Sequence, residues 1–318
     1  MKLSQAAVLP QEPLFYAVGL MGRAGKSSVA ITLSQIAHLL MRLNRLVVMD
    51  TDTVSIAGLD IDFSRVKVVD KSDIAHKVDL VIVVGGDGSI LQAAQTFVGT
   101  NIPVFGVNRG RLGFLADVSP QDVETKLQEV LNGSYQLDER FLLLMQIIDG
   151  ESVVHEDVAL NDVVLHAGKS VHAIDFQLKI NGIDVYRQHA DGLIVSTPTG
   201  STAYALSAGG PIIHPSLDAI CLAPMHPHTL SSRPIVVSSD SHITIRVHRD
   251  NRTQPMVSPD GKMSMPLHSR QVLSIKKSTD SLVLLHPVGF DFYESCRTKL
   301  NWSLYSDEFA LEGDGSFG

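Results

Sequence analysis

The chain has 318 residues, 44% of them hydrophobic and 19% charged, with a formal net charge of −8 at pH 7. This length suits two globular domains, the acidic balance argues against a surface for nucleic acid, and no apolar run reaches the about 18 residues that a membrane span needs. Because the two cysteines, Cys221 and Cys296, offer no disulfide framework, we expect a cytoplasmic protein with neither nucleic acid nor membrane as a partner.

The first half of the chain alternates short apolar runs, which predict strands, with stretches in which apolar residues recur at helical spacing. Strands are expected at residues 14–19, 46–49, 66–69, 80–84 and 103–107. Helices are expected at residues 26–43, 90–97 and 123–131. Repeated alternation of strand and helix predicts a Rossmann-like, doubly wound parallel sheet, which we assign to an N-terminal α/β domain over residues 1–137.

The pattern changes near Leu137, where polar and apolar residues begin to alternate with period two and long helical stretches become few. Strand-like segments lie at residues 142–148, 176–180, 242–247, 272–275 and 282–285. Turn dipeptides, Asn181-Gly182 and Asp260-Gly261, separate such segments. We therefore predict a β-rich domain over residues 138–287, followed by a C-terminal segment, 288–318, with a disordered acidic tail.

The most informative segment runs from residue 79 to residue 89. An apolar run that predicts a buried parallel strand leads into the turn Gly85-Gly86-Asp87-Gly88. Ser89 is expected to cap the next helix, whose free N–H groups and partial positive charge suit a phosphate. The carboxylate of Asp87 is unfavourable among phosphates unless it takes up a proton or holds a metal ion, so the segment suggests phosphoryl transfer. The alternative is an ordinary tight turn between a strand and a helix.

Two other glycine-containing loops follow predicted strands. The stretch 19–27 invites comparison with a P-loop, but it has Leu20 where a P-loop needs glycine, which leaves Arg23 as a candidate for facing phosphates. Asn108 opens the loop 108–115 at a strand end, where open α/β sheets bind ligands. Two interpretations of this loop are equally supported: Asn108 contacts a ligand, or the glycines simply allow a tight turn.

Polar residues interrupt the strands of the second half. Asn161-Asp162 separates two apolar triplets, and Asp162 is suited to accept hydrogen bonds from two ribose hydroxyls; a β-bulge or an exposed face is the alternative. Residues 191–211 place a strand before a dense set of hydroxyl residues suited to amides, purine edges and sugars, and Tyr204 adds a stacking face. Helix capping explains one or two of these hydroxyls but not all of Thr197, Thr199, Ser201 and Thr202.

Three histidines, His214, His226 and His228, lie near prolines in the same half of the chain. A metal cluster is one interpretation. Their spacing matches no closed zinc site, so loop histidines are the better interpretation and no residue is assigned as a metal ligand.

Taken together and in this order, the motifs resemble those of bacterial NAD kinases: the Gly-Gly-Asp-Gly turn, the Asn-Arg-Gly-x-Leu-Gly-Phe-Leu loop, the Asn161-Asp162 pair, and residues 191–204. The resemblance implies a phosphotransferase that moves the γ-phosphate of ATP to the 2′-hydroxyl of the adenosine ribose of NAD, giving NADP, with Mg²⁺ or another divalent metal. It also implies a C-terminal β-sandwich, a final segment that returns to the N-terminal domain, and a homodimer or homotetramer.

The resemblance assigns roles to individual residues, with Asp87 as the proton acceptor. Residues implied to contact NAD are Asp87, Gly88, Asn161, Asp162, His172, His189, Asp191, Thr199, Thr202, Ala203, Tyr204 and Ser207. The residues expected to bind ATP or its phosphates are four from the glycine turn, Gly85, Gly86, Gly88 and Ser89, and the two loop candidates Arg23 and Asn108.

Three positions depart from the family pattern. Asp162 stands where the family has Glu, which shortens the reach by about one ångström and affects turnover if it displaces reacting groups. Lys262 stands where the family has Gln, and His189 where close relatives have Arg, so we hypothesise that His189 alters the preference between NAD and NADH. The phosphoryl donor, ATP or polyphosphate, stays open. Rival functions are another kinase with the same glycine turn, such as a lipid kinase, and a non-catalytic dinucleotide-binding regulator.

Overall fold

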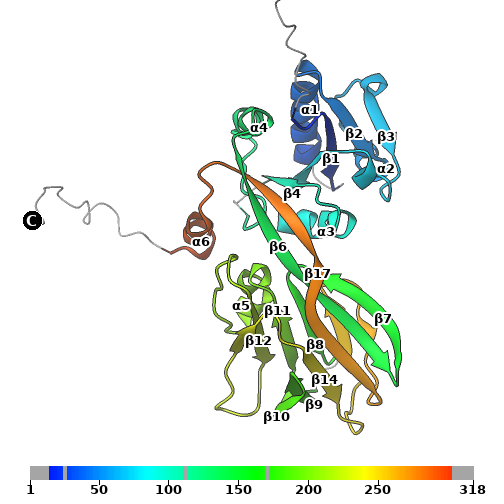
Figure 1. Ribbon diagram of the computed structural model, residues 1–318, viewed down its shortest axis with the longest axis vertical. Helices are drawn as coiled ribbons and strands as arrows, with labels where there is room; N and C mark the ends of the chain where they lie inside the picture. The colour runs from blue at the N-terminus through cyan, green and yellow to red at the C-terminus, as the bar shows by residue number, and fades with distance from the viewer. Residues whose placement is uncertain (1–13, 24–26, 110–112, 170–171, 303–318) are drawn as a thin grey trace, which may run out of the picture.

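The computed structural model describes residues 14–23, 27–109, 113–169 and 172–302 (Figure 1). It is elongated, with an α/β region at one end and a region of antiparallel strands at the other. Two long strands, β6 (Tyr135–Asp149) and β17 (Gln271–Pro287), run through both regions. Within the described ranges, no helix is both long and apolar enough to cross a membrane.

Five parallel strands form the sheet of the N-terminal region, in the order β5-β4-β1-β2-β3. Their bounds are β1 Ala17–Gly22, β2 Leu46–Asp50, β3 Val66–Val69, β4 Leu80–Gly85 and β5 Val104–Asn108. All five expected strands are present. β1 begins later than expected because Phe15 has a left-handed φ of 56°, which an extended strand does not accommodate.

Helices cover both faces of this sheet. α1 (Ser27–Arg42) and α4 (Val123–Leu131) pack on one face, where Leu33, Ile36 and Leu40 of α1 are fully buried at the predicted helical spacing. α3 (Asp87–Phe97) buries its apolar side against the other face. Shorter helical turns complete the region: α2 Thr51–Val54, η1 Phe63–Arg65 and η2 Ile74–His76. This arrangement confirms the expected doubly wound α/β domain.

The sheet continues into the second region because β17 pairs in parallel with β5 and antiparallel with β6. The segments expected at 272–275 and 282–285 are therefore one strand, with an irregularity between Lys277 and Ser281. The remaining strands of this sheet are β7 Ser152–Ala159, β9 Ile174–Ile180, β10 Ile183–Ala190 and β14 Ile243–Val247.

A second, antiparallel sheet has the order β13-β12-β11-β8-β15-β16. Its strands are β8 Asp162–His166, β11 Gly192–Ser196, β12 Ala219–Met225, β13 Ile235–Ser238, β15 Met256–Pro259 and β16 Met265–Pro266. Met145 and Phe176 from the first sheet share one core with Leu193 and Val257 from the second. Two sheets packed face to face in this way confirm the expected β-sandwich.

Three short helices complete the second half: η3 Thr199–Thr202, α5 Tyr204–Ser207 and α6 Phe292–Leu300. The division after residue 137 falls inside β6, so the hydrogen bonds of a single strand pair cross it. The limits 1–137, 138–287 and 288–318 therefore stay predictions. α6 reaches the N-terminal region, where the Phe292 ring centroid lies 6.2 Å from that of Phe114.

Candidate active site

The glycine turn between β4 and α3 is built by backbone geometry. Gly86 is the N-cap of α3, with an extended conformation (φ −96°, ψ −175°), and the helix begins at Asp87. The expectation that Ser89 caps the helix is wrong, because Ser89 lies inside the first turn and its N–H donates to the Gly86 carbonyl at 2.8 Å. A Cβ on Gly85 would lie 2.1 Å from Ser89 Oγ, whereas a Cβ on Gly86 or Gly88 would meet nothing within 4 Å. Gly86 and Gly88 thus leave open space above the start of α3.

Asp87 is held from several directions. Its Oδ1 accepts hydrogen bonds from the N–H groups of Leu115 (3.0 Å) and Ala116 (3.3 Å), and its Oδ2 accepts one from Phe114 N–H (3.1 Å). The Lys299 ammonium lies 2.7 Å from the same Oδ2. Burial raises the pKa of Asp87, but Lys299 and the backbone donors outweigh it and hold the pKa below its ordinary value. Asp87 is therefore an oriented, ionised carboxylate.

Gly113 allows this contact. A Cβ at position 113 would lie 2.2 Å from Asp87 Oδ1 and 2.8 Å from the Ala116 carbonyl oxygen. Only glycine lets residues 113–116 approach the carboxylate closely enough for their N–H groups to reach it. Gly113 therefore has the structural role that one interpretation of the loop 108–115 gives to glycine, which is to allow a tight turn. Residues 110–112 lie outside the described part of the chain.

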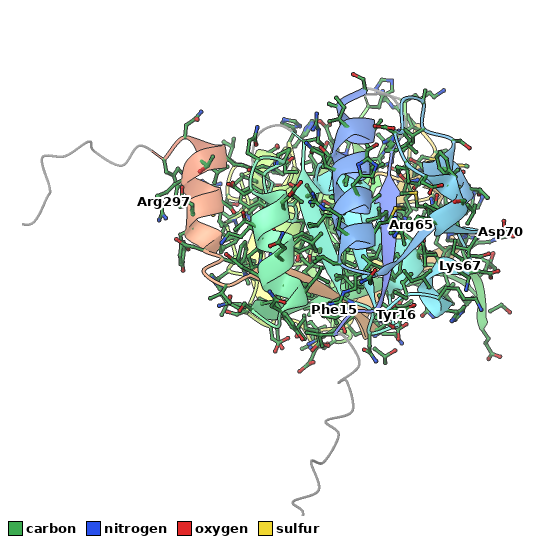
Figure 2. The ribbon with its side chains drawn as sticks, turned by 90° about the horizontal axis from the view of Figure 1, so that it is seen from above. Phe15, Tyr16, Arg65, Lys67, Asp70 and Arg297 are labelled. Atoms are coloured by element: carbon green, nitrogen blue, oxygen red, sulfur yellow. The ribbon has the colours of Figure 1, made fainter. Side chains whose placement is uncertain are left out.

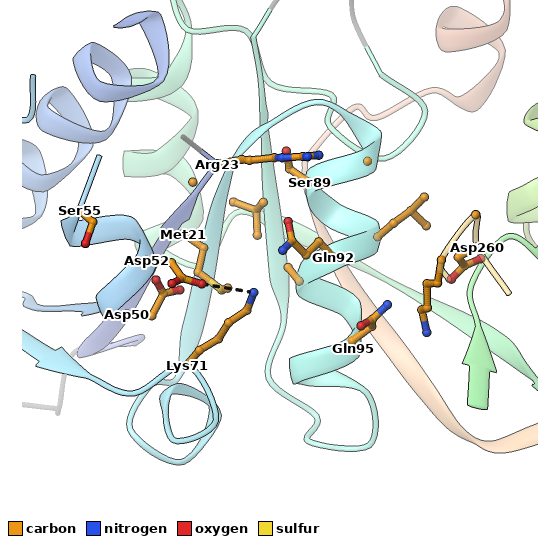
Figure 3. Close-up of a pocket in the computed structure, with 17 residues that line it drawn as sticks. Met21, Arg23, Asp50, Asp52, Ser55, Lys71, Ser89, Gln92, Gln95 and Asp260 are labelled. Carbon is orange, nitrogen blue, oxygen red and sulfur yellow. Dashed lines mark ion pairs between the residues drawn. The ribbon is translucent and has the colours of Figure 1, made fainter. Parts of the chain in front are cut away.

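A cavity of about 640 Å³ opens beside the start of α3 (Figure 3). Ser89, Gln92 and Gln95 lie along the side of α3 that lines it, and Asp260 lies on the opposite side. The remaining polar residues of its wall come from the N-terminal region and from the turn after β15: Arg23, Asp50, Asp52, Ser55, Lys71 and Lys262. The cavity therefore offers cations, hydroxyls and carboxylates within reach of the glycine turn.

A second cavity, of about 700 Å³, lies in the C-terminal region. It collects much of the set implied to contact NAD: Asn161, Asp162, Asp191, Ala203 and Tyr204. Asp260 and Gly261 line both cavities, so the two spaces adjoin at this turn. Gly88 and Asn161, 73 positions apart in sequence, thus line two adjoining cavities, which we together call the cleft.

Asp260 organises the Asn161-Asp162 motif. Its carboxylate accepts hydrogen bonds from the N–H groups of Leu160 (2.8 Å), Asn161 (2.7 Å) and Asp162 (3.2 Å). Burial nevertheless raises the pKa of Asp260. Burial, followed by the negative charge of Asp260, raises the pKa of Asp162 to about 7. The second cavity therefore contains a carboxyl pair, with Asp162 buried, that resists full ionisation.

The hydroxyl-rich segment is more structural than expected. Thr197 Oγ1 donates to the Leu160 carbonyl at 2.6 Å, and Ser201 Oγ donates to the Pro198 carbonyl at 2.6 Å. Thr202 Oγ1 donates to the Thr199 carbonyl at 3.2 Å. Thr199, Thr202 and Ser207 do not line either cavity, whereas Tyr204 and Ala203 do. Most of these hydroxyls hold the loop before α5 in shape.

Three other residues implied by the sequence, Asn108, His172 and His189, line neither cavity, although Asn108 pairs in register with Gly85 of the glycine turn. Asn108 ends β5 and is 4% exposed, and its backbone N–H donates to the Val118 carbonyl at 2.8 Å. His172 is exposed. His189 lines a different cavity, with its Nδ1 2.9 Å from Asp175 Oδ1 and its ring edge-on to His228. The hypothesis about His189 and NADH stays a prediction.

Charged residues that sequence reasoning missed connect the two regions. His286, 1% exposed, has its Nδ1 2.9 Å from Asp117 Oδ2 and its Nε2 3.5 Å from Asp138 Oδ2. Asp138 also pairs with Arg140, whose Nη1 donates to Thr199 Oγ1 at 3.1 Å. Burial lowers the pKa of His286, but the two carboxylates outweigh it and raise the pKa. The sequence signal that could have indicated this group of charged residues is Arg140, which directly precedes the apolar run 141–145.

The loop histidines have separate partners. His214 Nδ1 lies 2.8 Å from Ser216 Oγ, and His226 Nδ1 lies 2.9 Å from Asp191 Oδ2. In the described part of the chain, no three or more His, Cys, Asp or Glu side chains are grouped to hold a metal ion.

Comparison with known proteins agrees with this geometry. Residues 18–135 match the ATP-NAD kinase N-terminal domain, and residues 160–286 match the ATP-NAD kinase C-terminal domain. An NAD kinase of Psychrobacter arcticus is 63% identical over 96% of this chain and 94% of its own length. One from Acinetobacter baylyi is 54% identical over 94% of this chain and 96% of its own length.

Two solved structures are similar over most of the chain. Yeast NADH kinase complexed with NADH has a TM-score of 0.81 and 26% identity, covering 95% of this chain and 91% of its own. An NAD kinase from Archaeoglobus fulgidus in complex with ATP has a TM-score of 0.68 and 25% identity, covering 90% of this chain and 97% of its own. The matched domains, the relatives and the shared fold together place this chain in the NAD kinase family.

Proposed function

We propose that the chain transfers the γ-phosphate of ATP to the 2′-hydroxyl of the adenosine ribose of NAD, giving NADP, and that Asp87 accepts the hydroxyl proton. Family membership supports the reaction. The observation that carries the role of Asp87 is its position: it is an oriented carboxylate at the first residue of α3, directly before Gly88 and Ser89, which line the first cavity. A carboxylate placed there can remove a proton as the phosphoryl group arrives.

The cleft divides the two substrates between its two cavities. The triphosphate is assigned to the first cavity, where Gly86 and Gly88 leave space, the start of α3 favours negative charge, and Arg23 and Lys71 line the wall. NAD is assigned to the second, where Asn161, Asp162 and Asp191 offer polar groups and Tyr204 a stacking face. Solved relatives with ATP and with NADH are consistent with two nucleotide sites in this fold.

Phosphoryl transfer depends mainly on positioning and on stabilising negative charge. We expect a divalent metal, most simply Mg²⁺, to bind together with ATP. Mg²⁺ usually takes one or two carboxylates plus phosphate oxygens and water. Asp50 is 1% exposed and caps α2, so the carboxylate that suits the metal in the first cavity is Asp52, whose Oδ2 lies 3.8 Å from the Lys71 ammonium. When bound, the metal supplies positive charge to the phosphates. The protein supplies the helix start, the basic wall and the proton acceptor.

We further propose that the protein is a homodimer or homotetramer and acts in the cytoplasm. Both proposals follow from resemblance to the family. Light scattering on the purified protein determines the assembly, and fractionation of the source cells determines the compartment.

One assay tests the proposed function against its rivals. Purified protein is given ATP, Mg²⁺ and NAD, and NADP is measured with an NADP-specific dehydrogenase. We expect NADP to accumulate, and to stop accumulating when Mg²⁺ is chelated. Phosphorylation of diacylglycerol but not NAD would favour a lipid kinase, and NAD binding without ATP consumption would favour a regulator. Inorganic polyphosphate in place of ATP tests the donor.

A further inference from the structure

The C-terminal helix α6 brings a lysine to the proposed proton acceptor. Lys299, in the last turn of α6, places its Nζ 2.7 Å from Asp87 Oδ2, across 212 positions of sequence. Both side chains are 26% exposed. The same ammonium lies 4.9 Å from the ring centroid of Phe114, whose N–H also donates to Asp87. Lys299 therefore belongs to the same contact set as the loop 113–116 that orients the carboxylate.

Packing of α6 fixes where Lys299 lies. Asp291 caps the helix by accepting from Tyr293 N–H at 2.8 Å, and Phe292 and Cys296 are buried on its inner side. The Phe292 ring centroid lies 5.1 Å from that of His214 and 6.2 Å from that of Phe114. The helix is thus anchored to both regions of the molecule (Figure 1).

Arg297, on the same helix, provides a contrast. Its guanidinium pairs with Asp291 and Glu294 of its own helix, at 2.9 and 2.6 Å, and does not reach Asp87. Figure 2 shows Arg297 on the outer side of α6, away from the body of the molecule. One cation of α6 therefore stabilises the helix locally, and the other contacts the proposed proton acceptor.

We propose that Lys299 is a positioning residue for phosphoryl transfer, which holds Asp87 ionised and aligned with the loop 113–116 and so makes turnover depend on the docking of α6. This role rests on the proposed function. Among the described residues, Lys299 carries the charge that acts on Asp87, and the loop contributes backbone N–H groups only. A lysine that merely fastened α6 would change stability alone, and one that only bound phosphate would change the KM for ATP alone.

Three variants test the role. Lys299→Met removes the charge and keeps the length of the side chain, Lys299→Arg keeps the charge, and Arg297→Met is the control that removes a cation from the outer side of α6. Each is measured for thermal unfolding, for kcat and KM with both substrates, and for the pH dependence of kcat/KM. If Lys299→Met does not fold, Lys299→Gln replaces it as the uncharged variant at this position.

We expect Lys299→Met to lower kcat by about 10- to 100-fold, because a misplaced reacting group costs up to about 10²-fold, with KM values for ATP and NAD nearly unchanged. Without the ammonium the pKa of Asp87 rises, so the acidic limb of the kcat/KM profile moves to higher pH. Lys299→Arg should recover part of kcat, and Arg297→Met should retain wild-type kinetics.

Three results would overturn the role of Lys299: an unchanged kcat and acidic limb in Lys299→Met, an increase confined to the KM for ATP, or an equal kcat loss in Arg297→Met. Each of these three results can be interpreted only if the wild-type protein makes NADP. A wild-type protein that makes no NADP refutes the proposed function itself, so the two failures are distinguishable.

Discussion

Asp87, beside the first cavity, and Asp162, in the wall of the second, have opposite electrostatic settings. Asp87 accepts three backbone hydrogen bonds and contacts Lys299, so its pKa lies below the ordinary value despite burial. Asp162 is buried beside a second carboxylate, Asp260, and its pKa rises to about 7. One site is an ionised group held in place, and the other takes up a proton near neutral pH. The contrast separates a carboxylate that is ionised throughout the neutral range from one that is partly protonated there, so the role of Asp87 rests on its position and not on its basicity.

The difference originates in what each carboxylate meets. The N-terminal site draws N–H groups from the loop 113–116 and a cation from α6, whereas Asp260 uses its oxygens to hold the backbone before Asp162. A carboxylate is stabilised by donors and cations and destabilised by a second carboxylate. Residues of one chemical type therefore acquire different roles from their surroundings.

Asp87→Asn should have the largest effect. The amide keeps the shape of the side chain but cannot accept the 2′-hydroxyl proton, so turnover should fall by about 10²- to 10⁴-fold. Binding of NAD and ATP should change little. Steady-state kinetics and calorimetric binding measure the two quantities separately. Wild-type turnover in this variant would remove Asp87 from the mechanism.

Gly113→Ala should be next in size. The added Cβ would lie 2.2 Å from Asp87 Oδ1, so the carboxylate must move, and a shift of reacting groups by about 1 Å can cost about 10²-fold in kcat. Gly88→Ala is the contrasting variant, because its Cβ meets no protein atom within 4 Å and projects into space assigned to phosphate. It should raise the KM for ATP more than it lowers kcat. Identical kinetics in the two variants would contradict this distinction.

Asp162→Asn should act on binding. Loss of a hydrogen bond to a charged group costs about 1.5–3 kcal/mol, so the KM for NAD should rise about tenfold or more while kcat changes only a few-fold. Kinetics at pH 8, where wild-type Asp162 is mostly ionised, are the sharpest comparison. A kcat loss as large as that of Asp87→Asn would erase the proposed division of roles.

The pH dependence of stability should show the smallest effect. The folded pKa of Asp162 is raised, so its contribution to stability is complete below its unfolded value and is lost as pH rises towards about 7. Asp162→Asn should therefore gain stability relative to wild type between pH 5 and about pH 7, by at most about 1.4 kcal/mol for each pH unit crossed.

Asp87→Asn is the control for that measurement. The pKa of Asp87 is lowered, so its contribution is present above the unfolded value of 3.8 and is lost only as pH falls below it. Its effect on stability should be equal at pH 5 and pH 8. Denaturant unfolding at both pH values measures both variants, and parallel pH dependence in the two would contradict the contrast between the sites.

Much of the fold could be predicted because local patterns determine it. Runs of β-branched residues predict strands such as β3 and β4, of which β4 is fully buried, and α4 has the predicted bounds. β17 could not be predicted as one strand, because its polar middle, residues 276–281, resembles a turn. Pairing with β6 up to Lys277 and again from Ser281 joins the two halves into one strand across this irregularity.

The candidate site could be predicted only in part. Asp87, Asn161 and Asp162 were identified from glycine, amide and carboxylate patterns. Asn161 and Asp162 line the second cavity, and Asp87 directly precedes Gly88 and Ser89, which line the first. Lys299 and Asp260 were missed because their partners lie 212 and about 100 positions away in sequence, beyond any local pattern. Local sequence also cannot tell a hydroxyl that bonds its own loop from one that faces a ligand.

The most direct test of the contrast is a carboxyl NMR titration of the substrate-free protein with ¹³C-labelled aspartate. Asp87→Asn and Asp162→Asn assign the two resonances. We predict that Asp87 titrates below its ordinary pKa of 3.8 and Asp162 near 7. An Asp87 resonance that titrates at or above that of Asp162 would contradict the account, because Asp87 would then not be the ionised group available to accept the proton.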